Sequence, residues 1–466
     1  MLKYGKNIME RETAMSIKEF CLSIENEFKK KTAKARERLV SYSDCNIFNE
    51  AYGKTDEKIY VKSAVGDRLE DYDGNEYIDL AMGGGTFIIG HSSPMVIDQM
   101  RDQLNRGSLY TTPNFITYDF GKLLSKAIRN MNSFVFCNSG SEATMRAIRI
   151  ARAFTKKRKI GIFSGGWHGS HDMVLVDEDY SDNVENSRTV AKSSGVPKEM
   201  LELAIVLPYN HEAAFEIIKK HRDELAVVLV EPAQGSNPRD DMGAFLKGLR
   251  SVTRENDILL CFDEIITGFR VALGGAQEYY GIHADMATYG KTIGGGLPIG
   301  VVAGKGDIMN TIKNGTSLNP QPIFMGGTFS ANPLAMVAGL TTLSYLIDHR
   351  NDVYSYLNRS ASYLKSEVNS FCEMQGIPAR IYGFNSMMRL IFTDKPIRSR
   401  RERDKLEIDM QRQNIFYTAM LNSGIHIASN RLNFLSTAHT EEDIKKILLT
   451  YTSILNNFSK VGFFNE

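Results

Sequence analysis

The sequence predicts an α/β protein with a large domain built on a mostly parallel sheet flanked by helices, and a smaller α+β domain formed by both termini. From about residue 95 to 340, helical patterns alternate with short β-branched or apolar runs, which is typical of a helix-covered parallel sheet. The flanking segments have a different pattern. We therefore expect an N-terminal helix and part of the small domain in residues 1–95, the large domain in 96–340, and the rest of the small domain in 341–466.

The two ends of the chain carry their own signals. Residues 16–42 contain apolar positions among many charges and no Pro or Gly, which predicts an amphipathic helix. Asp73-Gly74-Asn75 lies between alternating apolar residues and predicts a hairpin turn. Beyond residue 340 we expect long helices, short strands near 424–428 and 434–436, and a last helix that begins at the capping sequence Thr440-Glu-Glu-Asp443.

The composition is that of a globular protein without a charge-driven partner. Of the 466 residues, 42% are hydrophobic and 24% charged, which argues against disorder. Lys and Arg total 56 against 55 Asp and Glu, so no excess positive charge favours nucleic acid or an anionic membrane. The five cysteines are widely spaced, and no apolar stretch marks the N-terminus. We expect a cytoplasmic protein with free thiols, no membrane span and no metal site.

Four apolar runs in the middle of the chain each stop at a polar or glycine-rich residue. If they are parallel strands, ligands bind outside their carboxyl ends, so the four endings should line one crevice. The runs are Phe134–Cys137 before Asn138, Val227–Val230 before Glu231, Ile258–Phe262 before Asp263, and Met286–Gly290 before Lys291.

The segment Asn138-Ser-Gly-Ser-Glu142 precedes a strong helical pattern. A small-residue turn that opens a helix presents free N–H groups and the positive end of the helix dipole, which suits a phosphate group. On this segment alone, an ordinary serine N-cap explains the pattern equally well.

Lys291 and Asp263 are the candidate reactive residues. Lys291 follows a short apolar strand, so its amine would be partly desolvated, which lowers the pKa of an amine and makes it a competent Schiff-base nucleophile. A carboxylate at the end of a buried strand, as at Asp263, can keep a pyridinium nitrogen protonated. The alternatives are a surface charge for Lys291, and a helix cap or a partner of Arg270 for Asp263.

An ordered set of motifs resembles the class III pyridoxal-phosphate aminotransferases, and among them most of all the glutamate-1-semialdehyde 2,1-aminomutases. The resemblance implies a fold type I enzyme and covers nearly the whole chain. The motifs are Asn138-Ser-Gly-Ser-Glu142, Trp167-His168-Gly169, Glu231-Pro232, Asp263-Glu-Ile-Ile-Thr-Gly-Phe-Arg270, Gly290-Lys-Thr-Ile-Gly-Gly-Gly-Leu-Pro298 and Gly327-Thr-Phe-Ser-Ala-Asn-Pro333.

The resemblance assigns roles to residues of this sequence. Lys291 would be the Schiff-base lysine and proton shuttle for pyridoxal 5′-phosphate, and Asp263 would pair with the ring nitrogen. Thr328 would reach the phosphate of the neighbouring subunit's cofactor, which implies a homodimer. His168 is either a cofactor-binding or a structural histidine. The other cofactor-binding residues implied are Ser139, Gly140 and Ser141 at the phosphate, Trp167 stacked on the ring, and Glu231 and Gln234.

Three departures from the aminomutases bear on the reaction: two favour transfer between two substrates, and the missing Ser-Pro-Val-Arg segment only disfavours the aminomutase. The usual Ser-Pro-Val-Arg segment is replaced by residues 46–54, which contain no such sequence, and Gln234 fits the Glu-Pro-x-Gln of ordinary transaminases. Arg431 stands where the aminomutases have Glu, and an Arg can grip a substrate carboxylate with two hydrogen bonds; the alternative is a surface loop Arg. We expect an aminotransferase that uses a donor such as glutamate and an unidentified carbonyl acceptor. The alternative is glutamate-1-semialdehyde 2,1-aminomutase, which forms 5-aminolevulinate.

Overall fold

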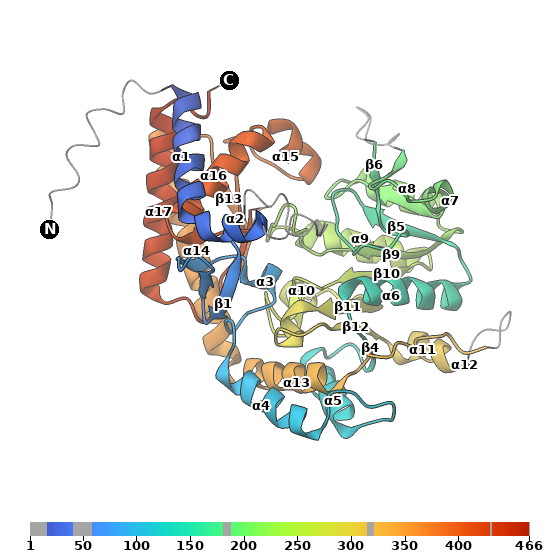
Figure 1. Cartoon of the computed structure of the whole chain (residues 1–466). Helices are drawn as coiled ribbons and strands as arrows, with labels where there is room; N and C mark the ends of the chain where they lie inside the picture. Colours follow the sequence, from blue (N-terminus) through green and yellow to red (C-terminus); the bar gives the residue numbers. More distant parts are fainter. Residues whose placement is uncertain (1–15, 41–57, 180–187, 315–320, 429–430, 466) are drawn as a thin grey trace.

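The computed structural model describes residues 16–40, 58–179, 188–314, 321–428 and 431–465. Figure 1 shows two groups of elements: one surrounds a central sheet, and in the other the N-terminal helix lies beside the last helices of the chain. Residues 46–54, whose sequence departs from the aminomutase pattern, lie outside the described residues.

The central sheet has seven strands, of which only one runs against the others. This confirms the predicted mostly parallel sheet. The antiparallel strand is β12, which lies between β4 and β11. In spatial order the strands are β4 (Ser133–Cys137), β12 (Gly300–Gly304), β11 (Met286–Gly290), β10 (Leu259–Asp263), β9 (Leu225–Val230), β5 (Lys159–Phe163) and β8 (Ala204–Leu207).

Both faces of this sheet are buried, which explains why its strands are continuous apolar runs. Along β9, Val228 and Val230 pack into one core while Val227 and Leu229 pack into another. Helix α6 (Gly140–Thr155) covers the second face with Ala143, Ala147, Ile148, Ile150 and Ala151.

The remaining elements around the central sheet are mostly helical. They are α4 (Pro94–Arg106), α5 (Phe115–Ala127), α7 (Lys198–Glu202), α8 (Ala213–Lys220), α9 (Gly243–Glu255), α10 (Gly275–Tyr280), α11 (Gly306–Met309), α12 (Thr311–Asn314), α13 (Pro333–Asp348) and the hairpin of β6 (Val176–Glu178) and β7 (Thr189–Ala191). Among the described residues, no helix combines the length and apolar character needed to cross a membrane.

The two ends of the chain build the second group together. Strand β15 pairs in parallel with β3, so a C-terminal strand completes the N-terminal sheet of order β1-β2-β3-β15. A second sheet has the order β13-β14-β16. The strands are β1 (Val61–Val65), β2 (Arg68–Asp71), β3 (Glu76–Asp79), β13 (Arg380–Phe384), β14 (Met387–Ile391), β15 (Ile425–His426) and β16 (Leu432–Phe434). The helices are α1 (Ile17–Lys31), α2 (Ala33–Val40), α3 (Met82–Gly85), α14 (Arg350–Gln375), α15 (Arg400–Leu406), α16 (Met410–Asn422) and α17 (Glu441–Lys460).

Several local predictions hold. The turn at residues 73–75 joins the antiparallel strands β2 and β3, and the Thr440 hydroxyl with Asp443 forms a capping box at the start of α17. The N-terminal helix begins at a capping box of Ser16 and Glu19, but it is interrupted at Thr32 and continues as α2. The domain boundaries stay a prediction, and α13 runs across the one expected after residue 340.

Arg270 connects the two groups of elements through hydrogen bonds. Its fully buried guanidinium donates two hydrogen bonds to the Gly85 carbonyl oxygen, at 2.8 and 3.1 Å. It also donates to the Ser386 hydroxyl at 3.0 Å and to the Leu435 carbonyl at 3.1 Å. Burial lowers the pKa of Arg270 to about 10, so the guanidinium remains charged at neutral pH.

We predict that Arg270→Met destabilises the protein because it leaves buried acceptors without a donor. Each buried unsatisfied group costs about 1–3 kcal/mol, so the free energy of unfolding should fall by about 3 kcal/mol or more. Denaturant titration followed by circular dichroism measures the change. Arg101→Met, at a side chain that is 73% exposed, is the matched control. Equal midpoints for the two variants would contradict this role of Arg270.

Candidate active site

One cavity of about 320 Å³ lies at the carboxyl ends of the central strands. The residues that follow β4, β9 and β11, together with the last residue of β10, line it, as the pattern of strand endings predicts. The lining consists of Thr86, Asn138, Ser139, Gly140, Ser141, Trp167, His168, Gly169, Glu231, Asp263, Ile265, Ile266, Lys291, Leu297, Pro298 and Ile299.

Lys291 reaches the cavity from the end of β11, where a short 3₁₀ helix (Lys291–Gly294) begins. Its φ of 44° lies in the left-handed region, which is strained for a residue with a side chain. Desolvation by the surrounding protein lowers the pKa of the Lys291 amine, and the positive charge of Arg270 adds to this; Glu231 and Asp263 act in the opposite direction. The amine is therefore more readily neutral, and more nucleophilic, than that of an exposed lysine.

Asp263 is held by three hydrogen bonds at the end of β10. One carboxylate oxygen accepts from the Ile265 backbone N–H and from the Thr288 hydroxyl, each at 3.1 Å. The other lies 2.7 Å from His168 Nδ1. Asp263 thus accepts from the turn that follows β10; no helix begins there, so it is neither a helix cap nor a partner of Arg270. His168 contacts Asp263 directly, so it helps to position this carboxylate beside the cavity.

The N-terminus of α6 forms another wall of the cavity. The Ser139 hydroxyl accepts from the Glu142 N–H at 3.1 Å and so caps the helix, while the Ser141 hydroxyl accepts from the Ser170 N–H at 3.1 Å. Gly169 has a φ of 105°, and a Cβ there would lie 2.5 Å from Ser141 Oγ. Only glycine therefore lets this loop approach α6. The helix end, with its free N–H groups and positive dipole, can hold an anion.

Two loops complete the wall near Glu231. Its carboxylate accepts from the Trp167 N–H at 2.9 Å and from the Gly235 N–H at 3.2 Å, and burial raises its pKa. Gln234 does not line the cavity; its amide donates to the Ser164 carbonyl at 2.9 Å and so braces the loop that carries Trp167. The Trp167 side chain lines the cavity and remains 55% exposed, and its stacking on a cofactor ring stays a prediction.

Arg431 and Thr328 lie outside the cavity lining. Arg431 is 2% exposed, and its guanidinium binds both carboxylate oxygens of Glu407 and donates to Gln413 Oε1 at 2.7 Å. The structure therefore does not bring Arg431 to the cavity, and it is not the surface Arg of the alternative either. Thr328 lies on an exposed segment, and its contact with a neighbouring subunit stays a prediction.

Sequence reasoning missed several residues of the site. Thr288 is a small polar residue inside the apolar run of β11, and that position, beside Asp263 in the sheet, could have indicated it. Thr86 follows a run of three glycines, a signal of close backbone approach. Asn138 opens the segment 138–142, whose pattern indicates the backbone and serines as an anion site but gives no role to the asparagine side chain.

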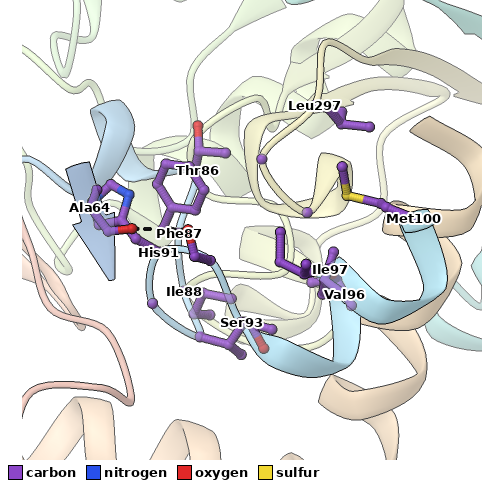
Figure 2. A pocket seen from close by; sticks show the side chains of 16 residues that line it. Ala64, Thr86, Phe87, Ile88, His91, Ser93, Val96, Ile97, Met100 and Leu297 are labelled. Atoms are coloured by element: carbon purple, nitrogen blue, oxygen red, sulfur yellow. Dashed lines mark hydrogen bonds between the residues drawn. The ribbon is translucent and has the colours of Figure 1, made fainter. Parts of the chain in front are cut away.

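A second cavity, of about 330 Å³, adjoins the first and shares Thr86 and Leu297 with it. Figure 2 shows its wall formed by Phe87, Ile88 and His91 on one side and by α4 on the other. His91 Nε2 lies 2.8 Å from an oxygen of the buried Asp79, which fixes this wall. Together, the two adjoining cavities provide more space for a ligand than the cavity at the strand ends does by itself.

The residues present fit a phosphate-bearing aromatic cofactor with a reactive carbonyl. Within the described residues, Asn138 Oδ1 and His168 Nε2 are buried without a hydrogen-bond partner, which indicates polar walls that a ligand can complete. The described residues contain no cluster of three or more side chains that could hold a metal ion. A helix end suited to an anion, a lysine of lowered pKa and a fixed carboxylate around one cavity are the groups expected of an α/β enzyme with a lysine-bound cofactor.

Comparisons with known proteins agree with this class. Residues 50–438 match the family described as aminotransferase class III. The chain is 37% identical over 402 residues to a glutamate-1-semialdehyde 2,1-aminomutase from Methanosarcina acetivorans, which covers 85% of this chain and 91% of the relative. It resembles the crystal structure of an omega-transaminase from Sphaerobacter thermophilus, with 29% identity, coverage of 91% and 97%, and a TM-score of 0.83. A transaminase solved with PLP bound gives 26% identity, coverage of 93% and 99%, and a TM-score of 0.81.

The chain belongs to the class III aminotransferase family. Its cofactor is pyridoxal 5′-phosphate, in agreement with the expectation from the sequence motifs.

The lowered pKa of Lys291 predicts how the apoprotein takes up pyridoxal 5′-phosphate as pH changes. Only the neutral amine attacks a carbonyl, so the uptake rate should rise with pH through an inflection below 10.5, the ordinary value for lysine. Stopped-flow absorbance of the apoprotein, mixed with cofactor across a pH series, measures it. Lys291→Ala, which removes the amine, should give no such pH-dependent phase. An inflection at the ordinary lysine value would contradict the desolvation of this amine.

Proposed function

We propose that this protein catalyses amino-group transfer at a pyridoxal 5′-phosphate held by Lys291. The observation that carries this proposal is that one cavity brings together the Lys291 amine, the Asp263 carboxylate and the N-terminus of α6. These three groups match the three parts of the cofactor: the carbonyl, the ring nitrogen and the phosphate.

The cofactor supplies an electron-withdrawing ring, and the chain supplies position and proton transfer. The N–H groups at the start of α6, with Ser139 and Ser141, would hold the phosphate. Asp263 Oδ1 is fixed by Thr288 and Ile265, and its other oxygen is bound to His168, so the carboxylate is held in one orientation in which it would pair with a ring nitrogen. Lys291 Nζ, with its lowered pKa, can accept a proton from substrate carbon and return it.

Two reactions of this kind are candidates, and the intramolecular one has the better support. The relatives that are 36–38% identical over more than four fifths of this chain carry the name glutamate-1-semialdehyde 2,1-aminomutase. Arg431, which would favour an aminotransferase if it bound a substrate carboxylate, instead binds the carboxylate of Glu407. Gln234 and the resemblance to a transaminase structure still favour the aminotransferase, and the altered sequence of residues 46–54 disfavours the aminomutase.

Two assays on the holoenzyme distinguish these reactions. The aminomutase forms 5-aminolevulinate from glutamate-1-semialdehyde with no added donor. The aminotransferase instead releases one 2-oxoglutarate per active site from L-glutamate alone and shifts the absorbance band of the bound cofactor. We expect 5-aminolevulinate in the first assay. Release of 2-oxoglutarate without any 5-aminolevulinate would replace the aminomutase by the aminotransferase.

Substitution of the two central residues tests the chemistry common to both reactions. Lys291→Ala should abolish turnover, and Asp263→Asn should lower it by about a hundredfold or more, the size typical of losing one electrostatic partner at a reacting centre. Steady-state assays measure both. Lys305→Ala and Asp98→Asn are matched controls, because these residues form ion pairs outside the cavity. Full activity in Lys291→Ala would refute the proposed function.

A further inference from the structure

Arg389 is a buried cation for which the fold provides no partner. It lies in the middle of β14 and is 6% exposed. Its Nε is buried without an acceptor, and no residue in the part of the chain that the structure describes accepts a hydrogen bond from, or forms an ion pair with, its guanidinium. An unpaired buried charge is expensive, so a fold that keeps one usually has a use for it.

The surroundings of Arg389 make its charge more costly. Arg403 and Arg431 repel the charge of Arg389, while Glu407 and Asp404 attract it. Both carboxylates are already engaged: Glu407 binds Arg431, and Asp404 binds Arg403 at 2.9 Å. Burial and the two arginines hold the pKa of Arg389 well below its usual range. Neither of these carboxylates therefore forms an ion pair with Arg389.

The register of β14 places Arg389 close to the wall of the cofactor cavity. We call the region around Gly235, Leu432 and Arg389 the seam. Arg389 is paired directly with Leu432 of β16, and opposite residues of an antiparallel pair project to the same face. On that face Leu432 packs beside Gly235, where a Cβ would lie 3.2 Å from Leu432 and 3.1 Å from Ile266. Ile266 lines the cavity. Arg389 is thus on the same side of its sheet as the residues next to the cavity wall.

Asn237 is a second buried polar side chain without a partner in the same seam. It is fully buried, and neither its amide oxygen nor its amide nitrogen has a hydrogen-bond partner among the described residues. Arg403 connects the two, because it repels Arg389 and donates to the carbonyl of Ser236, the residue before Asn237. The guanidinium of Arg389 and the amide nitrogen of Asn237 are donors without acceptors, and a carboxylate, with two acceptor oxygens, can bind such donors.

We propose that Arg389 binds the carboxylate of a substrate that extends from the cofactor cavity into this seam. The inference deepens the proposed function and rests on it for the identity of the substrate class. Arg431, paired with Glu407, then holds the seam in place and does not bind the substrate. Glutamate, its semialdehyde and the keto acids all carry the carboxylate that this site requires.

Binding of a non-reactive dicarboxylate to the holoenzyme tests the proposal without turnover. Glutarate binding is measured by isothermal titration calorimetry, and thermal midpoints are recorded with and without glutarate. Arg389→Met should weaken binding at least about thirtyfold, as expected when one member of a buried charge pair is removed. Arg389→Lys should weaken it about tenfold, the size of losing one charge-assisted hydrogen bond. Arg380→Met, at an exposed arginine of the neighbouring strand, should bind like the unsubstituted protein.

Stability distinguishes a substrate-binding arginine from a structural one. Without glutarate, Arg389→Met should keep or raise the thermal midpoint, because it removes an unpaired buried charge; a structural arginine would lower it. Unchanged glutarate affinity in Arg389→Met, or in Arg389→Lys if the first variant does not fold, would overturn the proposal. So would the absence of glutarate binding to the unsubstituted protein. If the unsubstituted holoenzyme formed neither 5-aminolevulinate nor 2-oxoglutarate, the proposed function would be refuted. The effect of Arg389 on glutarate binding would still be a valid result.

Discussion

The parallel pairing of β10 with β11 is the constraint on which the active site depends. Its register sets Asp263 directly beside Thr288, so the hydroxyl of one strand can hold the carboxylate of the next. Lys291 follows three residues after Thr288, at the point where β11 ends. The distance between the reactive amine and the carboxylate is therefore fixed by sheet geometry and not by a flexible loop, as a site that positions a rigid ring requires.

The second constraint is the set of hydrogen bonds by which Arg270 connects the two groups of elements. Arg270 comes from the loop after β10, yet its acceptors belong to α3, to the turn before β14 and to the residue after β16. The strands β14 and β16 also carry Arg389 and Leu432 of the seam, and Leu432 packs beside Gly235. Because Arg270 is charged and buried, the segments around it cannot separate without exposing or orphaning that charge. Arg270 thus holds the residues that flank β14 and β16, the two strands that carry Arg389 and Leu432.

Sequence alone could predict the parts of the site that depend on local patterns. Continuous apolar runs predicted buried strands, and the polar residues that end them predicted the cavity, because parallel strands share one carboxyl edge. The environment of Arg431 could not be predicted in this way, since Glu407 and Gln413 reach it from a loop and a helix that no periodicity relates to β16. The antiparallel β12 and the interruption of the N-terminal helix at Thr32 were likewise set by tertiary packing.

The buried polar groups without partners are distributed in an informative way. Asn422, Asn433 and Arg250 each lack a partner for one atom but form a hydrogen bond through another, and none of them lines the cavity. Arg389 and Asn237 form no side-chain hydrogen bond among the described residues, and both lie in the seam next to the cofactor site. A fold optimised only for stability would have filled this seam with apolar side chains, as it did around β9. The exceptions are concentrated where a polar ligand would be held, which makes the seam part of the site and not only its support.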